Sequence, residues 1–339
     1  MESAIPQHLA VARSLPSRVP EDFVPAYPSF VARTAGAVRQ VVMAYLGAAA
    51  GPVPEIDTGP DGPRHHDRAR QHDTGAVVIA AYWDDVATFE RWFTRCREPW
   101  LAGRGGRWIE VIKPTVERFE TIFGRRSRPE GVAVLAEEFS DEVLEHAYWG
   151  GMRDRMPASQ TDPLHDPTGF DVERDGQRVR VRSRGSVCLI RSGQDWSDCP
   201  DDERRTYLER VEPNLRRGMD FLRDEGRDVG CLANRYLTVL DGDGRPTAKT
   251  YGLSWWQTLA DLERWSESHP THLAIFGAFM KMATRGTPTR LRLYHEVAVA
   301  GPDEQWFEYS GCSDRTGLLD LAGRAPDPVR SPSPPASSA

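Results

Sequence analysis

The chain has 339 residues, 39% of them apolar, with a formal net charge of −7 and a pI near 5.8. Without a run of Lys and Arg or a stretch of about 18 consecutive apolar residues, neither nucleic acid nor a membrane is an expected partner, and a cytoplasmic location is expected. Five cysteines without a CxxC pair indicate neither a zinc site nor a disulfide framework.

The first half of the chain shows one strand–helix–strand pattern. Residues 1–20 are interrupted by Pro and are expected to pack loosely. Residues 77–80 predict a strand, residues 84–95 a helix with an acidic start, and residues 109–112 a second strand. Residues 151–177 mix Pro, Asp and Gly, so they are expected to cross over to the second half.

The second half predicts more elements. Strands are expected at residues 187–191, 235–240, 250–255 and 291–299, and helices at residues 201–225, 257–267 and 271–284. The tail, residues 325–339, is rich in Pro and Ser and is expected to be disordered. The two halves, about residues 21–150 and 178–324, are expected to form a single domain.

Two stretches of the chain, residues 80–93 and 254–265, are nearly the same. Each carries two Trp residues nine positions apart, Trp83 with Trp92 and Trp256 with Trp265. A Glu-Val pair follows each stretch, and aligning the two pairs places His295 opposite Ile109. This internal duplication predicts an α+β fold in which two ferredoxin-like halves form a β-barrel or sandwich flanked by helices.

The histidines are the chemical candidates, because the chain lacks a G-x-S-x-G, Walker A or strand-linked G-x-G-x-x-G motif. The HHDRARQH segment, residues 65–72, could gather a metal, but a solvated polar loop is the favoured interpretation. The HPTH segment, residues 269–272, is expected to cap or pack at a helix start. His146 fits a half-buried ring. By spacing alone, His295 is more often a core histidine than a ligand.

Several segments resemble the haem-containing aldoxime dehydratases, lyases that convert aldoximes to nitriles. The matching segments run in family order over roughly residues 20–323. They include GPRHHDRA at 62–69, RFET at 118–121, YWGGMRDRMP at 148–157, CLIRSGQDWSDC at 188–199, HPTH at 269–272 and YHEV at 294–297.

The resemblance implies a haem b cofactor whose iron has His295, in the HEV motif, as its axial ligand. It implies that an aldoxime binds the ferrous iron through its nitrogen. Distal groups then protonate the oxime hydroxyl so that it leaves as water, and loss of the neighbouring proton completes the nitrile. A histidine is the natural proton donor near neutral pH.

The distal groups implied by the resemblance are altered in this chain. The distal acid histidine of the family aligns with Ser313, whose hydroxyl cannot supply a proton at neutral pH. The distal glutamate aligns with Ala147, and the serine that holds the hydroxyl with Ala233 or Asn234. A distal arginine is retained as Arg191.

Three functions are therefore considered. The first is aldoxime dehydration with a neighbouring acid, such as Asp314, in place of the histidine. The second is a repurposed haem enzyme for other chemistry on an N–O substrate, such as rearrangement, cyclisation or N–N bond formation. The third is a non-catalytic haem sensor or carrier. A homodimer is a further expectation, because exposed sheet edges often pair between chains.

Overall fold

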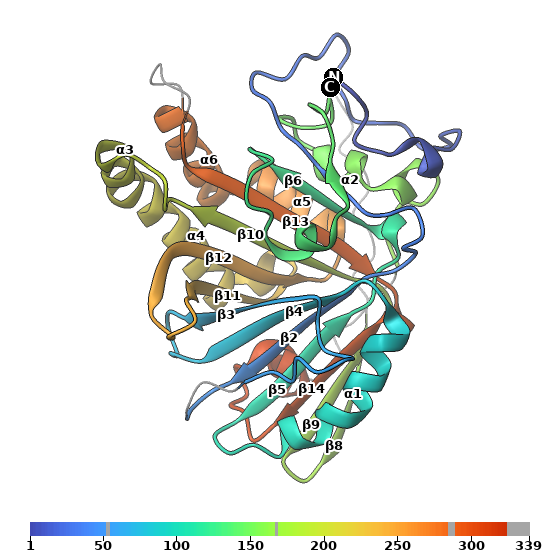
Figure 1. The fold of residues 1–339 in the computed structure, drawn as a ribbon, viewed down its shortest axis with the longest axis vertical. Helices are drawn as coiled ribbons and strands as arrows, with labels where there is room; N and C mark the ends of the chain where they lie inside the picture. Colours follow the sequence, from blue (N-terminus) through green and yellow to red (C-terminus); the bar gives the residue numbers. More distant parts are fainter. Residues whose placement is uncertain (52–54, 167–168, 284–288, 324–339) are drawn as a thin grey trace.

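The computed structural model describes residues 1–51, 55–166, 169–283 and 289–323, and its centre is one antiparallel sheet of twelve strands (Figure 1). In sheet order the strands are β6 (Phe119–Phe123), β13 (Arg292–Ala300), β10 (Val187–Asp195), β12 (Pro246–Trp256), β11 (Cys231–Leu240), β3 (His65–Gln71), β4 (Val77–Trp83), β2 (Val42–Ala48), β5 (Arg107–Ile112), β14 (Gln305–Ser310), β9 (Arg178–Ser183) and β8 (Phe170–Asp175). A separate pair joins β1 (Ala32–Arg33) to β7 (Glu138–Phe139).

The strand order repeats on the two sides of the β11–β3 junction. One side reads β11-β12-β10-β13 and the other β3-β4-β2-β5, with the strands in the same chain order. The next strand on each side comes from the other half of the chain, since β6 pairs with β13 and β14 pairs with β5. The predicted α+β class is confirmed, and the exchanged strands join both halves into one sheet.

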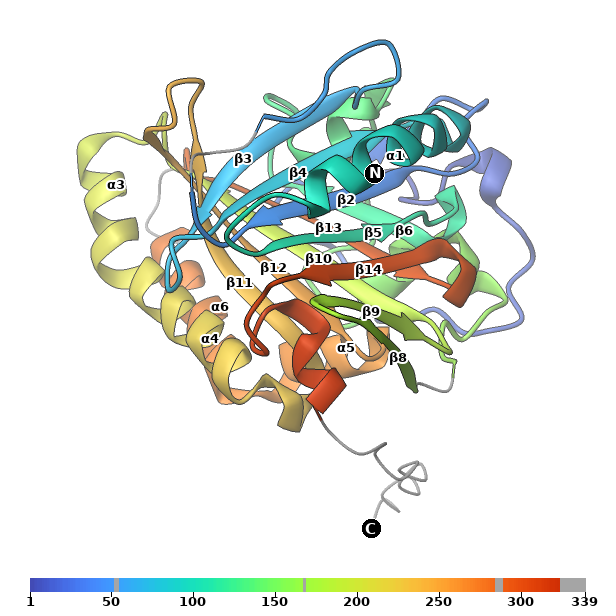
Figure 2. The same cartoon turned by 90° about the horizontal axis from the view of Figure 1, so that it is seen from below.

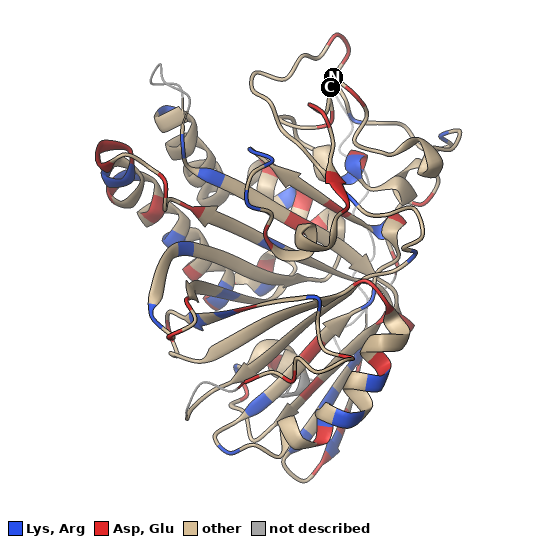
Figure 3. Ribbon diagram, in the orientation of Figure 1, with Lys and Arg blue, Asp and Glu red and all other residues tan. Residues whose placement is uncertain are grey.

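Helices cover the outer faces of the sheet (Figure 2). α1 (Val86–Leu101) packs its aromatic side chains on β2, β4 and β5, while acidic and basic residues are interspersed on its other face (Figure 3). α4 (Glu212–Asp224), α5 (Leu259–Ser268) and α6 (Pro270–Ala283) lie on the second half. A third apolar cluster, which includes Tyr45 and Trp255, fills the inner face between the halves.

Both repeated segments begin their helix in the same way. The side chains of Asp85 and Thr258 each accept a hydrogen bond from a backbone N–H three residues later, at 2.6 and 3.1 Å. The ring centroids of the repeated Trp pairs are 5.0 Å apart for Trp83–Trp92 and 5.6 Å apart for Trp256–Trp265. The predicted strand–Trp–helix pattern is thus present twice.

Two polar segments differ from prediction. The single helix expected at residues 201–225 is divided into α3 (Asp201–Thr206), a π turn at Tyr207–Val211, and α4. Pro213 lies at the start of α4 and lacks the N–H that a continuous α-helix would need. The prediction of a solvated loop at residues 65–72 is wrong, because this segment forms β3 in the middle of the sheet.

The crossover and the chain ends also carry structure. Residues 151–177 include the short helix α2 (Gly151–Arg155) and the edge strand β8. The N-terminal segment was expected to pack loosely, yet Ala4 and Ile5 are buried. The tail at residues 325–339 lies outside the described residues. Within the described ranges, none of the helices has the length and apolar composition that crossing a membrane requires.

Candidate active site

His295 lies on β13, on the face of the sheet that the helices cover. Its cross-strand neighbours are Ser192 on β10 and Ile122 on β6. Alternate residues of a strand share a face, and Val297 is buried in the core beneath α4 and α5. The His295 side chain itself is 22% exposed, so a small molecule can reach it.

The Nε2 atom of His295 lies between an acceptor and a donor. It is 3.0 Å from Glu120 Oε1 and 2.9 Å from Arg155 Nη2. When Nε2 is unprotonated, Arg155 donates to it, and when Nε2 carries a proton, it donates to Glu120. The ring nitrogen therefore has a partner in either protonation state, which suits a group that gives up and recovers a proton.

Glu120 and Arg155 form a buried ion pair. Arg155 Nε donates to Glu120 Oε2 at 2.6 Å, and Arg155 Nη2 donates to Oε1 at 3.1 Å. Burial opposes the charge of Glu120, but the Arg155 guanidinium and the His295 ring lower the pKa of this carboxyl below its ordinary value. Arg155 Nη1 also donates to the backbone carbonyl of Glu145 at 2.7 Å, which fixes the orientation of the guanidinium.

His272, in the first turn of α6, is a second histidine in this region. Its Nδ1 lies 2.6 Å from the backbone carbonyl of Ser266, so Nδ1 carries the proton and Nε2 keeps its lone pair. Burial lowers the pKa of His272 to about 4, against the effect of the Ser266 hydrogen bond, and the charge of nearby His295 lowers it further. The ring is therefore neutral near pH 7.

Helix α6 is apolar in sequence although most of its side chains are not buried. Of its fourteen residues, Lys281 is the one charged side chain and Met282 the one buried side chain. Phe276 is 39% exposed and contacts Trp149, which is 40% exposed and also packs against His272. Exposed apolar surface of this kind marks a binding site.

Arg191, predicted as a distal group, lies on the other side of the sheet from His295. It is in register with Glu296, the neighbour of His295, so its side chain points to the inner face. The buried guanidinium donates to Asp67 Oδ2 at 2.8 Å and to the Tyr82 hydroxyl at 2.7 Å. Arg191 thus joins β10 to β3 and β4 across the inner core.

Asn234 and Ser313 are also placed away from the His295 cluster. Asn234 is buried on β11, where it donates to the Met219 carbonyl at 2.7 Å and accepts from Ser254 Oγ at 2.8 Å. Ser313 is exposed in the loop after β14, with its hydroxyl 3.2 Å from that of Thr316. The structure does not bring Arg191, Asn234 and Ser313 together around His295.

The metal site considered for residues 65–72 receives no support. Across the ranges that the structure describes, no group of three or more His, Cys, Asp and Glu side chains is arranged to hold a metal ion. His72 instead packs its ring on Tyr236, with 4.5 Å between centroids.

Glu120 and Arg155 are the site residues that sequence reasoning missed. They lie 175 and 140 residues from His295 along the chain. A signal was present, because Glu120 falls in the RFET segment and Arg155 in the YWGGMRDRMP segment.

Comparison with known proteins decides the family. The family model described as haem-containing dehydratase matches residues 54–318. The chain belongs to this family. The haem-containing dehydratase is 41% identical to the aliphatic aldoxime dehydratase of Rhodococcus erythropolis, over 94% of this chain and 98% of the relative. It is 34% identical to the phenylacetaldoxime dehydratase of Bacillus sp. (strain OxB-1), over 76% and 78% of the two chains.

The solved structures agree with the sequence relatives. A crystal structure of an aldoxime dehydratase in complex with butyraldoxime superposes with a TM-score of 0.85 at 39% identity, covering 94% of this chain and 96% of that one. The predicted family is thereby confirmed, and the protein is a haem-dependent lyase.

The described residues fit the haem that the family requires. A histidine that ligates iron is neutral and usually donates its other ring N–H to a carbonyl, as His272 does to Ser266. The apolar surface of α6 and Trp149 beside it suits a large apolar cofactor. His269 is less suitable, because its ring is stacked on Phe221 with 4.3 Å between centroids.

Proposed function

We propose that the protein dehydrates aldoximes to nitriles and that His295 is the group that transfers the proton. The reaction converts R–CH=N–OH to R–C≡N and water. The observation that carries the proposal is the position of His295 Nε2 between Glu120 and Arg155. This arrangement supports both steps that the reaction needs from the protein.

In the first step, protonated His295 gives its Nε2 proton to the oxime hydroxyl, and the N–O bond breaks as water leaves. Arg155 then donates to the neutral Nε2. In the second step, Nε2 takes the proton from the oxime carbon, and Glu120 accepts the hydrogen bond from the restored N–H. Each turnover therefore returns the histidine to its starting state without net proton uptake.

His272 would hold the haem iron through its Nε2, and Trp149 and the apolar residues of α6 would contribute to the binding of the haem. Bound haem iron supplies a Lewis-acidic site for the oxime nitrogen. His295 was predicted as the axial ligand, but coordination by its Nε2 would displace both Glu120 and Arg155 from that atom. The buried ion pair would then lose its third partner, so we assign His295 to proton transfer instead.

The other functions considered depend on the absence of a histidine that can donate a proton. Rearrangement, N–N bond formation and a sensor role were attractive because the distal histidine aligned with Ser313. With His295 as the proton-transfer group, Ser313 needs no catalytic role, and its exposed position is consistent with this. Arg191 and Asn234 are assigned to the packing of the sheet.

We also propose that the two halves descend from one ferredoxin-like unit. The matching orders β13-β10-β12-β11 and β5-β2-β4-β3 support this, because the ferredoxin-like motif places its strands in the order 4-1-3-2. Among the described residues between β2 and β3 there is no helix, whereas α3 and α4 join β10 to β11.

The test is an anaerobic assay of the haem-loaded, reduced protein with aliphatic and aryl aldoximes, following nitrile formation. Wild-type protein and a Ser313→Ala variant should form nitrile at equal rates, and Glu120→Gln should be strongly impaired. Absence of nitrile from the wild type, or loss of activity in Ser313→Ala with Glu120→Gln unaffected, would overturn the proposal.

A further inference from the structure

The N-terminal segment, residues 2–9, lies across the structure as a strap that is attached at two places. At its start, Glu2 N donates to the Glu142 carbonyl at 2.8 Å, and Leu144 N donates to the Glu2 carbonyl at 3.1 Å. At its end, Gln160 Nε2 donates to the Leu9 carbonyl at 2.9 Å. Hydrogen bonds therefore hold the strap at both of its ends.

The first attachment leads directly to the Glu145 side chain. Ser3 Oγ donates to Glu145 Oε1 at 2.9 Å, and Ala4 N donates to Glu145 Oε2 at 2.8 Å. Arg33 reinforces the strap from the other side through its Nη1 contact to the Ala4 carbonyl and an Nη2 bond to the Ser3 carbonyl at 2.8 Å. Both carboxylate oxygens of Glu145 are therefore held by the strap.

Glu145 in turn holds Arg155 through its backbone. Its carbonyl accepts the Nη1 hydrogen bond of Arg155 at 2.7 Å. The loop around it is tightly turned, since Ala147 adopts a φ of 63° and Gly150 a φ of 104°. A backbone of this kind keeps its conformation when neighbouring contacts fix it, and the Glu145 carboxylate supplies such a contact.

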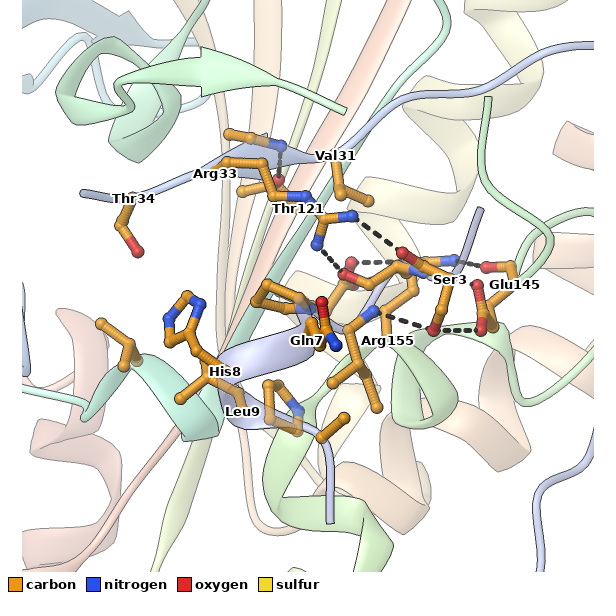
Figure 4. A pocket seen from close by; sticks show the side chains of 18 of the residues that line it. Ser3, Gln7, His8, Leu9, Val31, Arg33, Thr34, Thr121, Glu145 and Arg155 are labelled. Carbon is orange, nitrogen blue, oxygen red and sulfur yellow. Dashed lines mark hydrogen bonds and ion pairs between the residues drawn. The ribbon is translucent and has the colours of Figure 1, made fainter. Parts of the chain in front are cut away.

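A cavity lies beside the strap and the His295 cluster. It has a volume of about 750 Å³ and is lined by the strap on one side and by Glu120, Thr121 and Arg155 on the other. Figure 4 shows Ser3 and Glu145 meeting beside Arg155, with Gln7, His8 and Leu9 continuing along the wall. Because Arg155 lines this cavity, its Nη1 is held by the hydrogen bond to the Glu145 carbonyl, while its Nε and Nη2 are held by Glu120.

We propose that the strap is a positioning element for the reaction and that Glu145 is its positioning residue. Ser3 and Ala4 fix Glu145, Glu145 fixes Arg155 Nη1, and Arg155 Nη2 is thereby aimed at His295 Nε2. This inference rests on the proposed role of His295. It adds a function for the N-terminus, which contacts the His295 cluster through Glu145 and Arg155.

The effect should appear in kcat and not in KM. Arg155 donates to His295 Nε2 once that atom has lost its proton, so a misaimed guanidinium would slow the chemical step. Substrate binding does not depend on this contact, so KM would change little. A purely structural role for the strap would lower the melting temperature and leave the kcat of the folded enzyme unchanged.

The experiment compares Ser3→Ala and Glu145→Gln with the control His8→Ala, which changes an exposed side chain of the same strap. Measurements on the haem-loaded enzyme are the melting temperature and, for an aliphatic aldoxime, kcat and KM. We expect Glu145→Gln to lower kcat between about 10- and 100-fold with KM little changed, Ser3→Ala to lower it less, and His8→Ala to match wild type.

A double-mutant cycle separates this inference from the proposed function. In an Arg155→Lys background, Ser3→Ala should cause no further loss, because the group that the strap aims is gone. If Arg155→Lys leaves kcat unchanged, the proposed function fails. If Arg155→Lys is impaired while Ser3→Ala and Glu145→Gln keep the wild-type kcat, or if the losses in the cycle are additive, the strap inference alone is overturned.

Discussion

The two halves of the sheet use the same positions for different purposes. Ile109 on β5 corresponds to His295 on β13, and both lie two residues before a Val. Trp306 on β14 faces Val111, just as Glu120 on β6 faces Val297. In the first half, Trp306 packs on Phe93 of α1, and Glu308, which faces Ile109, pairs with Arg97 of the same helix.

In the second half the corresponding positions are a histidine and a glutamate. The helices above them differ as well, because the single long helix α1 is matched by the two shorter helices α5 and α6. One scaffold can thus use these positions for packing and ion pairing in one half and, in our proposal, for proton transfer in the other. The choice depends on two side chains and the helices that cover them.

On the inner face, by contrast, the halves remain alike. Glu110 and Glu296 follow Ile109 and His295, and each accepts a hydrogen bond from an aromatic side chain of the opposite half. Trp255 Nε1 donates to Glu110 at 2.7 Å, and the Tyr82 hydroxyl donates to Glu296 at 2.6 Å. These two hydrogen bonds link the halves. Both glutamates therefore contribute to stability, whereas the proposed catalytic residue lies in the second half.

The largest expected effect comes from substituting His295, and the matching position Ile109 serves as its comparison. His295→Gln should lower kcat for nitrile formation by about 10²- to 10⁴-fold, because a general acid and base is lost. Ile109→Val, at the matching position, should leave kcat unchanged and cost about 1 kcal/mol of unfolding free energy. Steady-state kinetics and thermal unfolding of the two variants check this. Equal losses of activity would remove the functional asymmetry of the halves.

The inner glutamates should differ in their contribution to stability. Glu110 receives two 2.7 Å hydrogen bonds from the buried Arg235 guanidinium. Glu110→Gln should therefore destabilise the fold by about 3–5 kcal/mol, because it leaves a buried cation without its counter-charge. Urea unfolding followed by Trp fluorescence measures this. A cost below about 1 kcal/mol, the scale of an exposed pair, would contradict the role given to this ion pair.

Glu296 should contribute less, and in a pH-dependent way. Burial raises the pKa of Glu296 above its ordinary 4.5, although Arg191 and Tyr82 oppose the shift. The folded protein then binds this proton more tightly than the unfolded chain, so the contribution to stability is present at low pH and is lost as pH rises above 4.5 through the folded value. Thermal unfolding from pH 4.5 to 8 should show a smaller decline for Glu296→Gln than for wild type. An identical decline would contradict the shift.

Much of the fold could be predicted from the sequence, because the repeat fixes local structure. The repeated Trp pairs indicated two matching strand–helix segments, and the acidic residues before residue 86, Asp85 among them, indicated the start of the first helix. β3 could not be found in this way, since its burial of Asp67 depends on Arg191, which lies 124 residues away. A polar strand in the middle of a sheet cannot be predicted from its own sequence when the residue that pairs with its buried charge is distant in the chain.

The sequence singled out His295, but as the axial haem ligand. The proton-transfer role that we propose for it instead depends on Glu120 and Arg155, which only the folded chain brings to one ring nitrogen. His272 was expected to cap or pack. Its hydrogen bond to the Ser266 carbonyl, which leaves Nε2 available, is a property of the turn between α5 and α6 and has no sequence signature.

Haem content is the most direct test of the two roles that we propose, proton transfer for His295 and haem binding for His272. His295→Gln and His272→Ala would be reconstituted with haem, and the haem stoichiometry and Soret band of each would be compared with wild type. The account predicts that His295→Gln keeps a full complement of haem and a wild-type ferric Soret band while nitrile formation is lost, and that His272→Ala fails to retain haem. Loss of haem from His295→Gln, with retention in His272→Ala, would contradict it.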